Sequence, residues 1–116
     1  MHALIVEDES LIAMAIEMVL RDCGFTSIAF ETTEAGAIKS ALRQCPDLIT
    51  CDVRLSQGSG IDAIASICSQ KTIPVIFLTG SAGEAKARYP DYPLLTKPFA
   101  DAALREEVTL VLGVIG

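Results

Sequence analysis

Four groups of polar residues stand directly after short apolar runs of the chain. The acids Glu7–Glu9 follow the first run, Asp52 ends the third, Thr79 the fourth and Lys97 the fifth. Carboxylates within a few ångström of one another repel strongly, and a hard cation such as Mg²⁺, which prefers oxygen ligands, offsets that repulsion. A lysine adds a charge that binds phosphate, and a threonine adds a hydroxyl donor. Together these are the parts needed for phosphoryl transfer to a carboxylate nucleophile.

The order of apolar and amphipathic segments predicts how these residues meet. Short apolar runs, typical of buried strands, alternate with segments in which apolar residues recur at helical spacing. Five strands that alternate with helices predict an α/β fold, a doubly wound parallel sheet covered on both faces. In such sheets the ligand site lies beyond the carboxyl ends of the strands. The expected strands are Leu4–Val6, Phe25–Phe30, Asp47–Asp52, Pro74–Thr79 and Tyr92–Lys97, and the expected helices are Ser10–Cys23, Thr33–Cys45, Ile61–Gln70 and Asp101–Leu112.

Local signals refine the helix prediction. Ser10 and Asp101 are expected to cap the first and last helices, because short polar side chains accept hydrogen bonds from the first free backbone N–H groups. Between Thr79 and Tyr92, two glycines and a proline surround a short polar stretch, which leaves room for one short helix at best. We expect this segment, residues 80–90, to hold a shortened fourth helix and to be the most mobile part of the molecule.

The composition is that of one globular domain over residues 1–116. Nine basic against fifteen acidic residues give a formal charge of −6, which argues against a surface that binds nucleic acid. No apolar stretch approaches the ~20 residues that a membrane span needs, and no basic leader precedes the first strand. Four cysteines without a C-x-x-C pair and a single histidine make a zinc site unexpected. We therefore expect a cytoplasmic protein with free thiols and no membrane contact.

The chain resembles a known family, the receiver domains of two-component response regulators, which belong to the CheY-like superfamily. No single motif is decisive, but five motifs occur in the right order, and the resemblance covers the whole chain. It implies the flavodoxin-like receiver fold with strand order 2-1-3-4-5. The motifs are Val6–Glu9, Pro46–Asp52, the following Gly60, Val75–Gly80 and Leu95–Phe99.

The resemblance implies a phosphoacceptor and a metal site. Asp52 would accept a phosphoryl group from a phosphohistidine on a sensor histidine kinase or a phosphotransfer protein, in a Mg²⁺-dependent reaction. Asp8 would bind Mg²⁺ directly and Glu7 through water. Asp52 and the backbone carbonyl of Arg54 would be further metal ligands.

The resemblance also implies roles on the far side of the site. Thr79 would turn to hydrogen-bond one phosphoryl oxygen and Lys97 would bind another, and the Lys97–Pro98 peptide is often cis in the family. A phosphorylated receiver of this kind switches its binding to a downstream protein partner or output domain. It is not expected to be an enzyme, because its only chemistry is self-catalysed phosphoryl transfer and slow autodephosphorylation. The position three residues before Lys97, aromatic in many receivers, is Leu94, so an aromatic rotamer change there cannot be the signal.

A closer resemblance is to receivers of the FATGUY and PhyR-like type. It rests on Leu11–Met14, Gly58–Ala63 and Pro74–Gly80. Such receivers belong to bacterial general stress signalling and are often served by histidine kinases of the HWE/HisKA2 type. This resemblance implies a kinase of that type as the phosphoryl donor.

Two alternatives stay open. A pseudo-receiver would keep the fold as a protein-interaction module without being phosphorylated, although all four key positions are present. An enzyme on a similar fold is the other alternative. A haloacid-dehalogenase-type phosphatase would have an Asp where this chain has Arg54, and a flavodoxin would have a Ser/Thr/Gly-rich phosphate loop where this chain has Glu7–Glu9. The phosphate-binding motif of P-loop enzymes is absent.

Overall fold

Five parallel strands form one sheet in the order β2-β1-β3-β4-β5, which confirms the predicted topology. The structure is a computed structural model, and it describes residues 1–113. The strands β1, β3 and β4 are buried along their whole length, as is typical of continuous apolar runs covered on both faces. The strand bounds are β1 His2–Val6, β2 Ser27–Glu31, β3 Leu48–Cys51, β4 Val75–Thr79 and β5 Leu94–Thr96.

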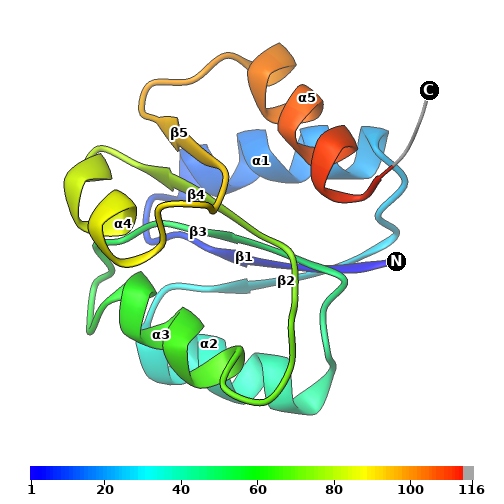
Figure 1. Cartoon of the computed structure of the whole chain (residues 1–116). Coiled ribbons are helices and arrows are strands. Elements are labelled where there is room, and N and C mark those ends of the chain that lie inside the picture. The colour runs from blue at the N-terminus through cyan, green and yellow to red at the C-terminus, as the bar shows by residue number, and fades with distance from the viewer. Residues whose placement is uncertain (114–116) are drawn as a thin grey trace.

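Helices cover both faces of this sheet (Figure 1). The helices α1 and α5 pack on one face, and α2, α3 and α4 pack on the other. No helix within residues 1–113 is both long and apolar enough to cross a membrane. The helix bounds are α1 Ser10–Asp22, α2 Glu34–Arg43, α3 Gly60–Ile67, α4 Ala82–Arg88 and α5 Asp101–Val111.

The alternation of side chains along the strands divides the core into two apolar clusters. In β1, Ala3 and Ile5 pack toward α1 and α5, whereas Leu4 and Val6 pack toward α2 and α3. Each fully buried side chain of the size of leucine contributes about 1.5–3 kcal/mol relative to exposure. The two clusters hold the strands in a fixed register, so that residues after the strand ends meet at one edge of the sheet.

Two predicted helix caps are wrong. The first helix has Glu9 as its N-cap instead of Ser10, because the Glu9 carbonyl already accepts the helical hydrogen bond from Ala13 N at 3.0 Å. Likewise Ala100, not Asp101, precedes the last helix, and its carbonyl accepts from Leu104 N at 3.2 Å. Ser10 and Asp101 are instead the first residues of their helices, and neither helix has a side-chain hydrogen bond at its N-cap.

The segment after β4 folds into the short fourth helix that the sequence predicts. It has seven residues, and Ala85 is its buried contact with the core. Beyond its end, Tyr89 and Tyr92 stack with ring centroids 4.7 Å apart, and both stack on Phe77 of β4. These contacts anchor the carboxyl end of α4. The mobility expected for this segment stays a prediction.

Candidate functional site

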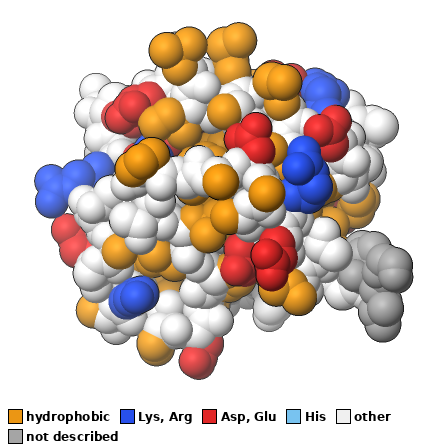
Figure 2. All heavy atoms as spheres, turned by 90° about the horizontal axis from the view of Figure 1, so that it is seen from above, with side chains coloured by type: hydrophobic (Ala, Val, Ile, Leu, Met, Phe, Trp, Pro, Cys, Tyr) orange, Lys and Arg blue, Asp and Glu red, His pale blue; other side chains and the backbone are white. Residues whose placement is uncertain are grey.

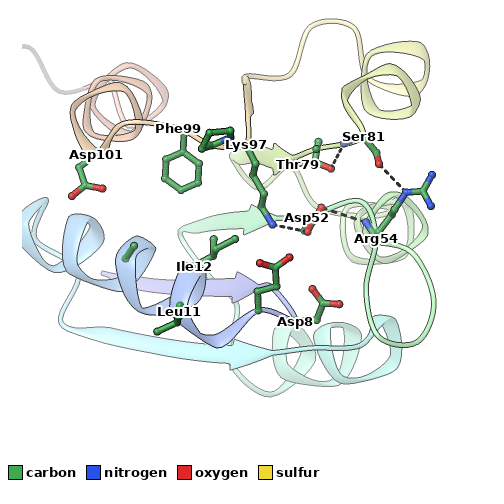
Figure 3. A pocket seen from close by; sticks show the side chains of 14 residues that line it. Asp8, Leu11, Ile12, Asp52, Arg54, Thr79, Ser81, Lys97, Phe99 and Asp101 are labelled. Atoms are coloured by element: carbon green, nitrogen blue, oxygen red, sulfur yellow. Dashed lines mark hydrogen bonds and ion pairs between the residues drawn. The ribbon is translucent and has the colours of Figure 1, made fainter.

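A cleft of about 650 Å³ lies at the carboxyl ends of the strands and brings the predicted residues together (Figure 3). Parallel strands end at the same edge of a sheet, so residues far apart in sequence become neighbours there. Asp8 follows β1, Asp52 follows β3, Thr79 ends β4 and Lys97 follows β5, and all four line the cleft. Arg54, two residues after Asp52, lines it as well.

Lys97 connects the two buried carboxylates of the site. Its Nζ lies 2.6 Å from Glu7 Oε1 and 2.8 Å from Asp52 Oδ2. Glu7 and Asp52 are only 4% and 7% exposed, so each would carry a large desolvation cost without a cationic partner. Lys97 is held in place by its backbone N–H, which donates to the Thr79 carbonyl at 3.1 Å, and the Lys97–Pro98 peptide is cis.

Burial and charge shift the pKa values of this trio in identifiable directions. Burial raises the pKa of Glu7 above its ordinary value, although hydrogen bonds from Lys97 and from Glu9 N oppose the shift. Burial alone would lower the pKa of Lys97. The hydrogen bonds and charges of Asp52 and Glu7 outweigh burial and raise the pKa of Lys97. The lysine is therefore charged at neutral pH, and burial makes Glu7 harder to ionise than an exposed glutamate.

The same residues offer a set of oxygen ligands. Carboxylate oxygens of Glu7, Asp8 and Asp52 all lie within 4.8 Å of one another. Three carboxylates against one lysine leave an excess of negative charge, and the exposed Asp8 has no cationic partner among the ion pairs of residues 1–113. A hard divalent cation that keeps several waters, such as Mg²⁺, fits this donor set. The Arg54 peptide lies beside it, because Arg54 N donates to Asp52 Oδ1 at 3.4 Å.

The side chains of Thr79 and Arg54 meet at Ser81, a residue that the sequence analysis did not single out. Thr79 Oγ1 accepts from Ser81 N at 2.9 Å, which leaves the threonine its own hydroxyl proton to donate. The Arg54 guanidinium points away from Asp52, donates to Ser81 Oγ at 2.8 Å and lies 3.7 Å from Glu84 Oε1 (Figure 3). Ser81 lies two residues after the end of β4. Its place close behind a strand end is the feature of the sequence from which its role in the site could have been predicted.

One wall of the cleft is apolar. It is formed by Leu11, Ile12 and Ala15 of α1 and by Pro98 and Phe99 after β5. The surface formed by α1 and α5 also shows apolar side chains among the charged ones (Figure 2). On α1 the exposed apolar residues are Leu11, Met14 and Met18, at spacings that place them on one side of the helix.

Comparisons with known proteins agree with this geometry. The family model described as the response regulator receiver domain matches residues 3–109. The phyllosphere-induced regulator PhyR of Methylorubrum extorquens is 34% identical over 113 residues, which cover 94% of this chain and 42% of that protein. The chain spans about half the length of the curated relatives it matches.

Solved structures extend the comparison to the fold and the metal. The PhyR receiver domain of Erythrobacter litoralis, solved by NMR, has a TM-score of 0.88 and 32% identity, covering 97% of this chain and 90% of that one. The receiver domain of the sensor histidine kinase PA1611 from Pseudomonas aeruginosa has a TM-score of 0.81 and 29% identity, covering 97% of each chain. That structure holds a magnesium ion in its active-site cleft. The fold, the strand-end residues and these matches together show that the chain belongs to the response regulator receiver domain family.

Proposed function

We propose that the chain is a phosphorylation-dependent signalling switch whose phosphoacceptor is Asp52. The observation that carries this proposal is the position of the Asp52 carboxylate. One of its oxygens contacts Lys97 Nζ, the other accepts from Arg54 N, and the group lies within the three-carboxylate cluster. A carboxylate in this setting is a nucleophile with a cation beside it and with room for a divalent metal.

The proposed reaction starts from a phosphohistidine on a sensor kinase or a phosphotransfer protein. An Asp52 oxygen attacks the phosphorus, the new P–O bond forms as the P–N bond breaks, and the electron pair stays on the imidazole nitrogen. Lys97 Nζ, already beside Asp52 Oδ2, stabilises the negative charge of the phosphoryl oxygens. Glu7, Asp8, Asp52 and the Arg54 carbonyl would hold Mg²⁺, which would supply further positive charge to the site. Thr79 donates its hydroxyl proton to a phosphoryl oxygen.

Hydrolysis of phospho-Asp52 would end the signal. A water molecule attacks the phosphorus of phospho-Asp52, the P–O bond to the carboxylate breaks, and inorganic phosphate and a free Asp52 result. This self-catalysed cycle sets the lifetime of the signal and consumes no small-molecule substrate other than water. On this proposal the chain acts as a switch and not as an enzyme.

We propose that the phosphoryl donor docks beside the cleft, on the apolar face of α1. Leu11, Met14 and Met18 are 80%, 58% and 68% exposed, and Leu11 also lines the cleft. A row of exposed apolar residues next to a reactive group is suited to a protein partner. Nucleic acid is a poor partner for a chain of charge −6.

The similarity to PhyR supports the finer proposal that the donor is a kinase of the HWE/HisKA2 type and that the output is a protein contact. The four cysteines have no disulfide partner, as suits a reducing compartment, and we place the reaction in the cytoplasm. The competing proposal is a pseudo-receiver that binds its partner constitutively. The intact pairing of Lys97 with Asp52 favours the phosphorylated switch.

Amide NMR of the Mg²⁺-loaded chain tests the proposal, with beryllofluoride as a phosphoryl mimic. We expect large shifts around Asp52, Thr79 and Lys97 in the wild type and none with D52N. D62N is the matched control, because Asp62 is an exposed acid on α3 outside the cleft, and this variant should respond like the wild type. A wild type that responds to neither Mg²⁺ nor beryllofluoride would contradict the switch and favour the pseudo-receiver.

A further inference from the structure

The loop between β3 and α3, which carries Arg54, is closed on itself by backbone contacts. Arg54 and Ser59 form an antiparallel bridge, and Gly60 N donates to the Val53 carbonyl at 2.8 Å. These contacts join the two ends of the loop into one unit. The position of the Arg54 peptide beside Asp52 depends on what holds that unit against the rest of the molecule.

The first residue of α2, Glu34, holds the β3–α3 loop in place. Glu34 Oε1 accepts from Ser59 N at 3.0 Å, and Glu34 N donates to the Gln57 carbonyl at 3.0 Å. Next to these contacts, Ser56 Oγ donates to the Thr32 carbonyl at 2.9 Å. Glu34 is thus bonded to the loop through both its side chain and its backbone.

Gly58 shows how closely the loop approaches this glutamate. Its φ of +84° lies in the left-handed region, and a Cβ added there would lie 2.5 Å from Glu34 Cβ. The Glu34 side chain occupies the space where any larger residue at position 58 would place its first carbon. The loop and Glu34 are therefore closely packed against each other as well as hydrogen-bonded.

Stabilisation of α2 alone does not explain the contacts that the Glu34 side chain makes. An acid in the first turn of a helix interacts favourably with the helix dipole, but Thr33 already supplies the side-chain cap by accepting from Gly36 N at 3.0 Å. The Glu34 carboxylate accepts from the β3–α3 loop, 25 residues further along the chain. Its contact joins α2 to the loop of the phosphoacceptor.

We propose that Glu34 is a positioning residue for the metal site: its carboxylate holds the β3–α3 loop so that the Arg54 peptide, whose N–H donates to Asp52 Oδ1, stays beside the three carboxylates. The inference rests on the proposed function, because it assigns to Arg54 the role of a metal ligand. Residues that orient metal ligands from outside the coordination sphere commonly change metal affinity 10–100-fold when removed. Glu34 acts through the backbone, so we expect an effect near the lower end of that range.

The test compares E34A, E34Q and E106A by Mg²⁺ titration, followed by the amide shifts of Asp52 and Arg54. E34A removes the acceptor of the Ser59 N–H and should weaken Mg²⁺ binding about tenfold. E34Q keeps an acceptor oxygen at the same place and should bind Mg²⁺ like the wild type. E106A removes an equal charge at an exposed site on α5 and should have no effect.

Thermal unfolding in EDTA separates positioning from simple stability. If E34A lowers the melting temperature but its folded form binds Mg²⁺ as the wild type does, the positioning role is overturned. It is also overturned if E34Q loses as much Mg²⁺ affinity as E34A, because the effect would then come from charge. A wild type that binds no Mg²⁺ would overturn the proposed function and this inference together.

Discussion

Among single residues, Glu7 is a carboxylate whose ionisation the fold opposes. Its carboxylate is buried, and its pKa is raised by that burial even though Lys97 is 2.6 Å away. The lysine also pairs with Asp52, so its charge is shared between two carboxylates. The folded state therefore favours the protonated form of Glu7 more than the unfolded state does.

This preference predicts a pH dependence with a definite sign. The pKa of Glu7 lies above its ordinary value of 4.5 in the folded chain, so the folded state holds this proton when the unfolded state has lost it. Stability is then lost as the pH rises from 4.5 through the folded pKa. In EDTA, the free energy of unfolding of the wild type should fall relative to that of E7Q over this window. Urea unfolding at a series of pH values measures the difference.

Adding Mg²⁺ should stabilise the wild type more than E7Q at neutral pH. A ligand at one hundred times its dissociation constant stabilises the folded state by about 2.7 kcal/mol, and E7Q has one carboxylate fewer to bind the ion. Parallel curves for the wild type and E7Q across the pH range in EDTA would contradict the assigned burial cost.

Among the elements, α4 is connected to the loop that follows Asp52. Its first turn is joined to the β3–α3 loop by the Arg54 side chain, which bonds Ser81 and lies near Glu84. The helix itself has no side-chain cap. Leu94 of β5, where many receivers have an aromatic residue, packs with Tyr92 against the same cluster as α4. We therefore predict that a change at Asp52 affects α4 through Arg54, without an aromatic rotamer change at position 94.

We predict that R54A loosens α4. An exposed pair of this kind is worth about 0.5 kcal/mol, so amide exchange over residues 82–88 should rise about twofold. The matched control is R43A, because the Arg43 side chain is 74% exposed, against 76% for that of Arg54, and lies near Glu31 instead. Hydrogen-exchange mass spectrometry compares the two. Equal exchange of α4 in wild type and R54A would show that the arginine does not hold this helix.

Two helical glycines predict opposite effects of one added methyl group. At Gly60, the start of α3, a Cβ would lie 1.8 Å from the Asp52 carbonyl oxygen and 2.7 Å from Cys51 Sγ, so α3 would have to move. G60A should lower the free energy of unfolding by about 3 kcal/mol. At Gly83 in α4 a Cβ meets nothing within 4 Å, and G83A should raise the free energy of unfolding by about 0.5–1 kcal/mol. Urea unfolding measures both, and effects of the same sign would contradict the packing at Gly60.

At the scale of the whole molecule, the sequence predicted the features that depend on periodicity. The runs Leu4–Val6 and Pro74–Leu78 are apolar throughout because β1 and β4 are buried on both faces. Asp52 and Lys97 could be placed in one site because parallel strands end at one edge. The family resemblance added the strand order, which the five-stranded sheet confirms.

The features that the sequence did not predict depend on where individual backbone groups lie. The N-caps at Glu9 and Ala100 follow from which carbonyl accepts the first helical bond, and residue type did not show this. The last strand has three residues instead of six, and Tyr92, outside it, stacks on Tyr89 and donates its N–H to the Tyr89 carbonyl at 3.2 Å. The contacts of Ser81 and Glu34 depend on loop conformation and span 27 and 25 residues of sequence.

The division of the core by the sheet has a consequence for how such a chain can diverge in evolution. The two apolar clusters share no side chain among the residues that the structure describes. Substitutions without shared partners have nearly additive effects on stability. The helices α1 and α5 can therefore change sequence to suit a new partner while the packing under α2 and α3 is kept. Lineages can thus acquire new recognition specificities without altering the chemistry at the sheet edge.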